Sequence, residues 1–290
     1  MKATNDGTQS APSLRLYMSM YAIHAMPQFA GHSSEQKLEA IQQAGYHGVQ
    51  FNGGTKEEHA YARSLRLGIA ESGRINKPEE SDAFAANFAS LGCECATVHL
   101  GWGFENEAEG NRLIQSVLDA AAKHNLPIYP ETHRATLFEN MWRTLQFASH
   151  FPDLSFNADY SHWYTGSEMV YGEVGWKFDL LEPIFSRTRF MHRRISDPGC
   201  IQVPVLSKDD DRSFVEHFRD MWTRSFRGFL QAAKPGDYFC FSPEVLQPDI
   251  FYSRTTPGPN GEQIEVSDRW QQSLLLNQIA LACFAAAQQD

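Results

Sequence analysis

Short runs of β-forming residues alternate with helical patterns eight times along this chain of 290 residues. Alternation of this kind is typical of repeated βα units around a parallel sheet. Eight units in a chain of this length predict a single-domain α/β protein with a (β/α)8 TIM barrel. The expected strands are residues 14–20, 47–51, 67–71, 94–100, 126–131, 154–159, 187–192 and 238–243. The expected helices are residues 33–44, 55–64, 78–91, 106–124, 136–150, 175–185, 213–233 and 267–287.

The ends and the long loops of the chain differ in composition from these units. Residues 1–13 are polar and lack an apolar core, so they predict a flexible N-terminal tail ahead of a barrel that spans residues 14–290. Residues 196–211 and 245–266 are irregular and follow the seventh and eighth strands. Barrels carry their active-site loops at these places, so both stretches are expected to be substrate lids.

Bulk composition excludes several classes of partner. The net charge of −10 leaves little basic surface for phosphates, which argues against nucleic-acid binding. No apolar run approaches the roughly 20 residues that span a bilayer, so no membrane partner is expected. The five cysteines fit no disulfide framework and indicate a reducing, cytoplasmic compartment. We therefore expect a small-molecule partner, and the sequence leaves a homo-oligomer open.

Four successive strands, the fifth to the eighth, end in a side chain that can bind a metal ion: Glu131, Asp159, His192 and Glu244. Each of these residues alone has an ordinary structural explanation, such as a carboxylate at a helix N-terminus or a buried core imidazole. Their shared position matters more, because the carboxyl ends of barrel strands meet at one rim. The sequence therefore predicts that the four side chains converge on one metal site.

Strand alternation supports this convergence, because residues two apart point to the same side of a strand. Asp159 is in register with Asn157, and Glu244 is in register with Ser242, whereas Phe241 occupies the opposite side. Polar residues are thus expected inside the barrel, and large apolar residues outside against the helices. Two glutamates, an aspartate and a histidine suit one Mn²⁺, Mg²⁺ or Co²⁺ ion better than a structural zinc, although Zn²⁺ remains an alternative.

Short motifs extend this pattern to a known family. The chain resembles the xylose-isomerase-like sugar isomerases and epimerases, which include ketose 3-epimerases, inosose dehydratases and, more distantly, endonuclease IV. The resemblance covers nearly the whole chain. The motifs that carry it are Glu131-Thr132-His133-Arg134, Asp159-Tyr160-Ser161-His162-Trp163, His192-x-Arg194, Pro243-Glu244 and Val98-His99-Leu100-Gly101.

The resemblance implies a role for each of these side chains. The metal ligands would be Glu131, Asp159, His192 and Glu244, and the two glutamates would also be the catalytic proton-transfer groups. The substrate-binding residues would be His162, Arg194, His133, His99 and Trp163. The substrate would be a sugar.

This constellation predicts chemistry next to a carbonyl. A divalent cation, with Mn²⁺ the first expectation, stabilises the enediolate that forms when a carboxylate removes the proton α to a keto-sugar carbonyl. An enzyme that then returns the proton to the substrate is an epimerase or an isomerase. Loss of a β-leaving group instead gives a lyase or dehydratase of a keto-sugar, an inosose or a 3-keto-glycoside. A non-catalytic sugar-binding or partner subunit is a further alternative, although the paired glutamates argue against it.

The chain also departs from its relatives. Endonuclease IV has an additional histidine after the third strand and an Asp-x-His pair after the seventh, and neither is evident here, so a phosphate hydrolase with several metals is disfavoured. Gln50 stands where many relatives carry an acidic residue. The long step from His192 to Glu244 predicts a different lid and a different substrate.

Overall fold

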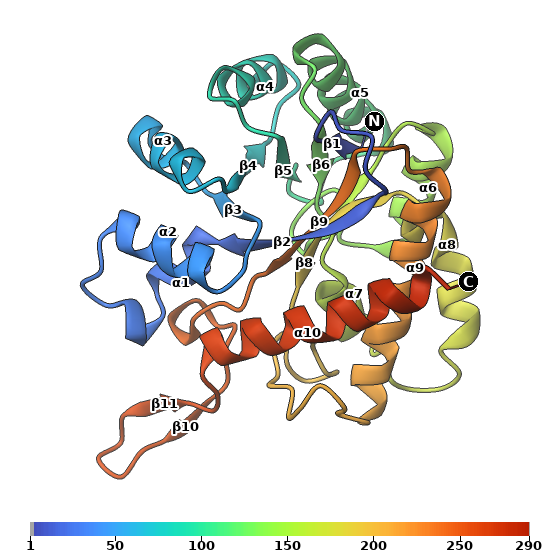
Figure 1. Cartoon of the computed structure of the whole chain (residues 1–290). Coiled ribbons are helices and arrows are strands. Elements are labelled where there is room, and N and C mark those ends of the chain that lie inside the picture. Colours follow the sequence, from blue (N-terminus) through green and yellow to red (C-terminus); the bar gives the residue numbers. More distant parts are fainter. Residues whose placement is uncertain (1–2, 290) are drawn as a thin grey trace.

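The computed structural model describes residues 3–289 and contains a ring of eight parallel strands surrounded by helices (Figure 1). All eight predicted strands are present, which confirms the (β/α)8 barrel. They are β2 (Ser13–Ser19), β3 (Gly48–Phe51), β4 (Gly68–Ile75), β5 (Cys95–Leu100), β6 (Ile128–Pro130), β7 (Phe156–Ala158), β8 (Thr188–Arg193) and β9 (Asp237–Pro243).

The strands are hydrogen-bonded in the order β6-β5-β4-β3-β2-β9-β8-β7. The ring closes between β6 and β7 through an isolated parallel bridge that joins Glu131 to Asn157. The backbone N–H of Thr132 also donates to the Asn157 carbonyl at 3.0 Å. The barrel is therefore nearly closed, and its least regular junction lies where two polar site residues meet.

The helices that cover the barrel also follow the predicted order. They are α2 (Ser34–Gln43), α3 (Lys56–Ser64), α4 (Glu80–Ser90), α5 (Glu107–His124), α6 (Met141–His150), α8 (Gly175–Phe185), α9 (Ser213–Ala232) and α10 (Arg269–Ala287). Capping boxes begin α2, α3 and α5, which satisfies backbone N–H groups at their first turns. The fifth predicted helix, residues 136–150, starts later than expected, because Asn140 is its N-cap.

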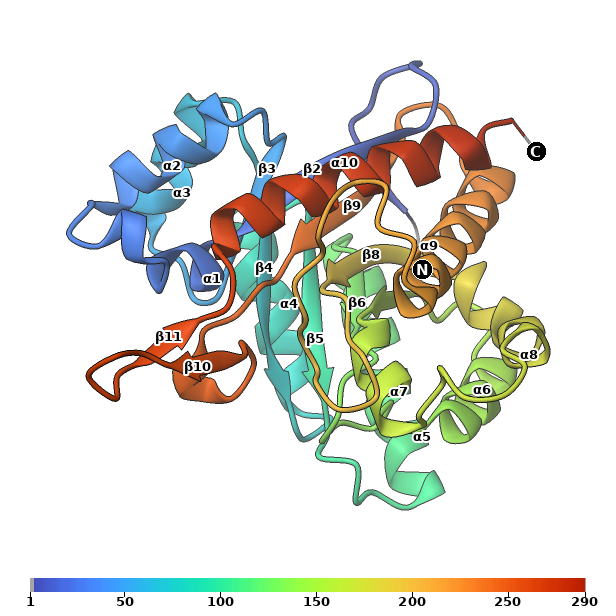
Figure 2. The ribbon, with the colours of Figure 1, turned by 90° about the horizontal axis from the view of Figure 1, so that it is seen from below.

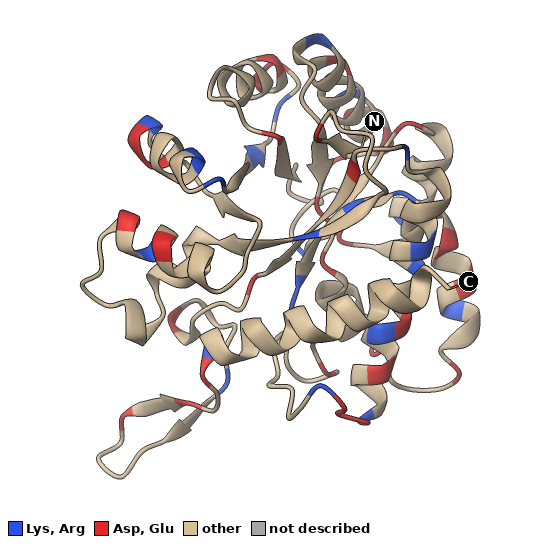
Figure 3. Ribbon diagram, in the orientation of Figure 1, with Lys and Arg blue, Asp and Glu red and all other residues tan. Residues whose placement is uncertain are grey.

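Short elements complete the chain on the loops between these units. They are the helices α1 (Met20–His24) and α7 (Tyr160–Gly166), the 3₁₀ turns η1 (Pro27–Phe29) and η2 (Pro248–Ile250), and the hairpin strands β10 (Thr255–Pro257) and β11 (Gln263–Glu265). The hairpin projects away from the barrel (Figures 1 and 2). Acidic and basic residues are interspersed over the outer helices (Figure 3). Within residues 3–289, no helix combines the length and the apolar character needed to cross a bilayer.

Side chains sort between the two faces of the strands as the alternation predicted. One buried cluster fills the lower barrel interior and consists of Tyr17, Ala70, Cys95, Tyr129, Phe190, Tyr238 and Cys240. On the other face of β9, Phe239 and Phe241 pack against Phe226 of α9, with ring centroids 5.0 and 5.7 Å apart. The interior is thus apolar near its base and polar only toward the C-terminal ends of the strands.

The N-terminal segment differs from the predicted flexible tail. Thr4–Asn5 forms β1, which pairs antiparallel with β9. Thr4 is buried, and its hydroxyl lies 3.0 Å from that of Tyr129 inside the barrel. The prediction therefore fails for these two residues, because pairing with the bottom edge of β9 supplies hydrogen bonds that the local sequence does not reveal. Residues 1 and 2 lie outside the described part.

The two predicted lid segments contact each other above the C-terminal ends of the strands. Gln202, from residues 196–211, donates to the Leu246 carbonyl at 3.0 Å and accepts from the Leu246 backbone N–H at 2.8 Å. Arg254 forms an ion pair with Asp197 at 2.9 Å. The loops after β8 and β9 therefore form a connected structure rather than two independent flaps.

Candidate functional site

Glu131, which directly follows β6, lies at the centre of a buried polar cluster. Its Oε2 lies 3.0 Å from Nδ1 of His192 and 3.3 Å from Nε2 of His99, and it accepts from the Asn157 amide at 3.1 Å. Its Oε1 is buried without a hydrogen-bond partner. Burial would raise the pKa of Glu131, but His192 and His99 outweigh burial and hold the pKa well below its usual value. Glu131 is therefore an ionised carboxylate with an available oxygen.

Arg194 joins the other two carboxylates of the predicted set. Its Nη2 contacts Oδ2 of Asp159 and lies 2.6 Å from Oε2 of Glu244. Asp159 also accepts from the backbone N–H of Ser161 at 3.0 Å. Burial would raise the pKa of Asp159, but the guanidinium of Arg194 holds it well below its usual range. One cation thus bridges two carboxylates from different strands.

His192 lies between the two predicted catalytic glutamates. Its Nδ1 is 3.0 Å from Oε2 of Glu131 and 3.6 Å from Oε2 of Glu244. Its Nε2 lies 2.8 Å from Oε1 of Gln50, on the opposite wall of the barrel. Burial alone would lower the pKa of His192, but the charges of Glu131 and Glu244 raise it to about 9. Deprotonation of His192 at Nδ1 would leave a lone pair on this nitrogen facing the carboxylates of Glu131 and Glu244.

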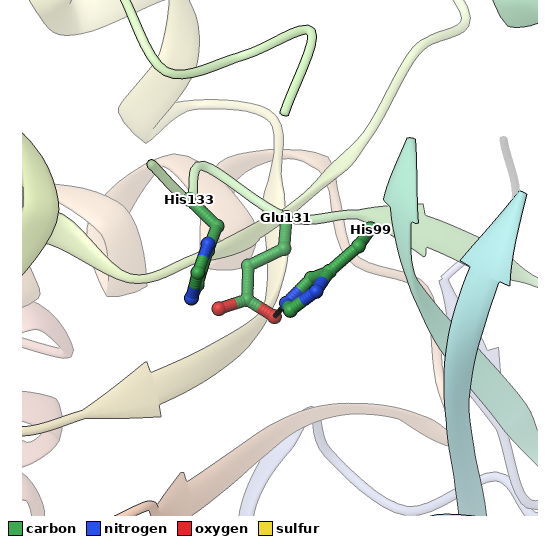
Figure 4. Close-up of side chains that lie close together, drawn as sticks. All are labelled: His99, Glu131 and His133. Atoms are coloured by element: carbon green, nitrogen blue, oxygen red, sulfur yellow. Dashed lines mark ion pairs between the residues drawn. The ribbon is translucent and has the colours of Figure 1, made fainter. Parts of the chain in front are cut away.

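Three further imidazoles stack along one side of this cluster. The ring of His133 is centred 4.2 Å from that of His99 and 3.9 Å from that of His162. Figure 4 shows His99 and His133 on either side of the Glu131 carboxylate. Burial and the neighbouring His162 lower the pKa of His133 to about 2, so it is neutral at physiological pH. Burial also lowers the pKa of His162, against the opposing charge of Asp159. Nδ1 of His162 is buried without a hydrogen-bond partner, and Nε2 lies 3.4 Å from Oδ2 of Asp159.

Three overlapping groups of side chains can hold a metal ion, and Glu131 belongs to all of them. The ligand atoms in each group lie within 4.8 Å of one another. The groups are Glu131 with His192 and Glu244, Glu131 with Asp159 and His162, and Glu131 with His99 and His133. The four predicted ligands therefore converge around Glu131. The unpartnered Oε1 and the excess of carboxylate oxygens fit a divalent cation.

Searches by sequence give no relative, since no protein-family model and no curated protein matches the chain. Solved structures do match. An L-ribulose 3-epimerase has a TM-score of 0.61 at 12% identity, covering 95% of this chain and 96% of that chain. The probable 3-DHS dehydratase involved in petrobactin synthesis from Bacillus anthracis has a TM-score of 0.57 at 14% identity, covering 82% and 94%. The fold is that of the xylose-isomerase-like TIM barrels.

A third structure with this fold has a bound metal ion. It is a xylose isomerase-like TIM barrel protein from Mycobacterium smegmatis in complex with magnesium, with a TM-score of 0.55 at 10% identity, and the match covers 96% of this chain and 99% of that one. At such identities the likeness shows the xylose-isomerase-like fold alone. The site of the present chain must therefore be argued from its own side chains.

One residue expected to bind substrate lies elsewhere in this xylose-isomerase-like barrel. Trp163 is buried, and its indole N–H donates to the Phe138 carbonyl at 3.0 Å. Its ring packs near Tyr160 in the layer between the barrel and the helices. The reason is local, because α7 starts immediately after Asp159 and a helical turn directs Trp163 away from His162. The other eight predicted site residues lie together.

The structure also adds site residues that the motifs did not identify. Gln50 and Asn157 hydrogen-bond to His192 and Glu131, and their interior register on the strands is the signal that could have revealed them. Tyr252 places its hydroxyl 3.2 Å from Nε2 of His133. It comes from an irregular lid segment, where no periodicity marks it.

Arg74 is another added residue, because β4 runs farther than predicted. Its Nη2 lies 3.3 Å from Nδ1 of His99. A guanidinium cannot accept a hydrogen bond, so Nδ1 accepts and Nε2 of His99 carries the hydrogen that faces Glu131. Arg74 therefore fixes the tautomer with which His99 contacts the central carboxylate.

Proposed function

We propose that this protein is a divalent-metal-dependent sugar isomerase or epimerase that removes the proton α to a keto-sugar carbonyl. The observation that carries the proposal is the convergence of two glutamates on one imidazole. Oxygens of Glu131 and Glu244 lie within 4.8 Å of each other and of a nitrogen of His192. A pair of carboxylates in a buried, donor-rich site suits proton transfer. The fold shared with an L-ribulose 3-epimerase agrees with this chemistry.

The residues that would hold the cation are Glu131, Asp159, His192 and Glu244. Mn²⁺ is the first expectation for this donor set, with Mg²⁺, Co²⁺ and Zn²⁺ as alternatives. A divalent ion held there would supply positive charge that stabilises the negative charge developing on the substrate oxygens. Oε1 of Glu131 is buried and has no hydrogen-bond partner, so it is the atom that a bound cation would most clearly satisfy.

The two glutamates would divide the proton transfer. One carboxylate takes the α-proton, and the electron pair of the broken C–H bond forms the C=C bond of an enediolate. The other glutamate, which must enter the step protonated, returns its proton to the substrate. Return to the opposite face of the same carbon re-forms the C–H bond with inverted configuration, which is epimerisation. Return to the neighbouring carbon moves the carbonyl group, which is isomerisation.

The imidazoles and Arg194 would hold the substrate hydroxyls. Nδ1 of His162 is buried without a hydrogen-bond partner, whereas Nε2 lies 3.4 Å from Oδ2 of Asp159. Nδ1 is therefore the atom that can hydrogen-bond to a sugar hydroxyl. His133 is neutral and lies on the same side of the site. A sugar bound by these groups would satisfy polar atoms that are otherwise buried without partners.

A lyase or dehydratase is the second candidate function, and Tyr252 is the observation that favours it. Its hydroxyl lies 3.2 Å from His133 and comes from the lid above the site. Such a hydroxyl can donate a proton to a departing oxygen after the α-proton has been removed. The probable dehydratase among the similar structures agrees with this alternative.

The test is exchange of the substrate α-proton. Mn²⁺-loaded protein is incubated in deuterated water with ketoses, inososes and 3-keto-glycosides, and proton NMR follows the loss of the α-signal and the products. We expect exchange with at least one compound. The variant Glu244→Gln should abolish exchange while keeping part of the bound metal, and Glu173→Gln, at an exposed position, should match the wild type.

The products separate the alternatives. Inverted or isomerised sugar supports the first function, and an unsaturated product supports the lyase. Binding of a sugar without any α-exchange would support the non-catalytic sugar-binding alternative. Unchanged exchange by Glu244→Gln would refute the assigned role of that residue.

A further inference from the structure

Arg74 carries a guanidinium at the edge of the site without a carboxylate partner. The side chain is only partly exposed, and no Asp or Glu in residues 3–289 lies within ion-pair distance of it. Its Nη1 donates to the Gly101 carbonyl at 2.6 Å, and its plane lies 4.0 Å from the ring centre of Trp102. Burial lowers the pKa of Arg74, and the charges of Glu131 and then Glu105 act against it from beyond ion-pair distance. Glu105 itself accepts the backbone N–H groups of Trp102 and Gly103. The carbonyl of Gly101 and the ring of Trp102 therefore hold the guanidinium in place, and no carboxylate of the described residues pairs with it directly.

Arg134, the residue after His133, carries a second guanidinium near the site. It is exposed, and the described part of the chain offers it no ion-pair partner either. Its guanidinium lies over the ring of Tyr252, 4.9 Å from the centre. Nη1 of Arg74 lies 3.4 Å from the carbonyl oxygen of Ala135, the residue next to Arg134. The two arginines therefore approach one short stretch of the loop after β6.

The contrast with Arg194 shows what is unusual about this pair. Arg194 contacts the carboxylates of Asp159 and Glu244, which neutralise it. The chain as a whole has ten more acidic than basic side chains, 35 against 25. Arg74 nevertheless contacts His99, and Arg134 lies over Tyr252, whose hydroxyl is 3.2 Å from His133. Within residues 3–289, neither arginine has a carboxylate at ion-pair distance.

We propose that Arg74 and Arg134 form an oxyanion subsite, so that the substrate is an acidic sugar bearing a carboxylate or a phosphate. The planar donors of a guanidinium match the oxygens of either group, and charge-assisted hydrogen bonds to them are strong. The inference rests on the proposed function, because it places the carbonyl end of the same substrate at Glu131 and Glu244. The acidic end then lies beyond His99 and His133.

A matched series of ketoses tests the subsite. D-Fructose, D-fructuronate and D-fructose 6-phosphate differ only at the sixth carbon, which bears a hydroxyl, a carboxylate or a phosphate. The readout is the ratio of kcat/KM for α-proton exchange between each acidic ketose and D-fructose, with Mn²⁺-loaded protein. A ratio cancels any effect that Arg74 exerts on the shared chemistry through His99.

We expect a ratio well above one for the carboxylate or the phosphate, and whichever acid gives the larger ratio identifies the group. Arg74→Gln and Arg134→Gln should each reduce this ratio about tenfold, the loss expected for one charge-assisted hydrogen bond. The control Arg66→Gln is in the turn that precedes β4, at the opposite end of this strand from Arg74, and should leave the ratio unchanged. Equal rates for all three sugars, or a ratio that neither variant alters, would overturn the proposal.

A second measurement separates failure of the subsite from failure of the proposed function. If no ketose exchanges its α-proton, the enediolate chemistry fails, and thermal stabilisation of the Mn²⁺-loaded protein by the three sugars still reports binding. Greater stabilisation by an acidic ketose, lost in Arg74→Gln and Arg134→Gln but kept in Arg66→Gln, supports the subsite. Identical stabilisation by all three sugars rejects it.

Discussion

Gln50 of β3 and His192 of β8 meet across the barrel, with Oε1 of Gln50 2.8 Å from Nε2 of His192. The amide nitrogen of Gln50 in turn donates to the Thr97 hydroxyl at 2.8 Å. An amide oxygen accepts hydrogen bonds only, so Nε2 carries a hydrogen and Nδ1 is the nitrogen that faces Glu131. A neutral residue thus orients the imidazole that we propose as a metal ligand.

Removal of this contact should weaken metal binding. Without Gln50 the imidazole of His192 can rotate or change tautomer, and loss of such an outer contact typically costs about 10- to 100-fold in metal affinity. We expect Gln50→Ala to show that loss for Mn²⁺ in a titration against a competing chelator. Gln278→Ala, exposed on α10, is the control. Equal affinities for wild type and Gln50→Ala would show that Gln50 does not orient the ligand.

Removal of the metal should destabilise the folded chain. The carboxylates around Glu131 repel one another, and an ion that binds only the folded state stabilises it by about 2.7 kcal/mol at 100 times its Kd. Chelation followed by dialysis should therefore lower Tm, and added Mn²⁺ should restore it with one ion bound per chain. Asp159→Asn should reduce the restoration. A Tm that does not respond to any divalent ion would contradict a metal site.

We predict that replacing Arg193 with an apolar residue increases the stability of the fold. It is fully buried on the outer face of β8 against the ring of Phe241, and its Nε and Nη2 lack hydrogen-bond partners. Among the described residues its hydrogen bond to Asn277 is long, at 3.5 Å. Burial holds the pKa of Arg193 well below its usual value. An uncompensated buried charge is costly, so Arg193→Met should raise the free energy of unfolding by at least about 1 kcal/mol.

Arg189 on the same strand is the matched control for Arg193. Its Nη1 donates to the carbonyl oxygens of Ser186 and Thr188, both at 2.8 Å. Arg189→Met should therefore lower stability or leave it unchanged in the same denaturant titration. A loss of stability in Arg193→Met would indicate that the guanidinium has a compensating partner.

The lid after β8 should contribute stability that depends on pH. Side-chain hydrogen bonds from Arg212 lower the pKa of Asp210 from 3.8 to about 2, and the Leu206 backbone N–H also donates to it. A carboxyl group whose folded pKa is depressed stabilises the fold fully above its unfolded pKa, and this contribution is lost as the pH falls toward 2. We expect Asp210→Asn to be about 1 kcal/mol less stable at pH 7. The gap should close between pH 4 and pH 2. A constant gap across this range would exclude the carboxylate as its source.

The sequence predicted the architecture well because the relevant signals are local. Runs of apolar residues and helix caps define each βα unit, and the identity of the residue at each strand end places Glu131, Asp159, His192 and Glu244 at one rim. Strand alternation also separated the polar interior of β7 from its apolar outer side. These features depend on neighbours a few residues away in the chain.

The parts that escaped prediction depend on distant contacts. Thr4 becomes a strand residue only because β9 offers an edge, and Tyr252 reaches the site only because its lid folds back over His133. Trp163 was assigned to the site because it follows His162, but the early start of α7 directs it outward. Arg74 lies beyond the predicted third strand, residues 67–71, because β4 continues through it to Ile75.

The irregular junction between β6 and β7 has a consequence for dynamics. Few backbone hydrogen bonds join these strands, and the bridge from Glu131 to Asn157 is continued by the Thr132 hydroxyl, which accepts from the Asp159 backbone N–H at 2.9 Å. Local opening of the barrel is easiest where the ladder is shortest. Amide hydrogen exchange at Thr132 and Asp159 should therefore be fast relative to β5 and β9 and should slow when the site is filled. Occupancy of the site could thus be followed without any catalytic assay.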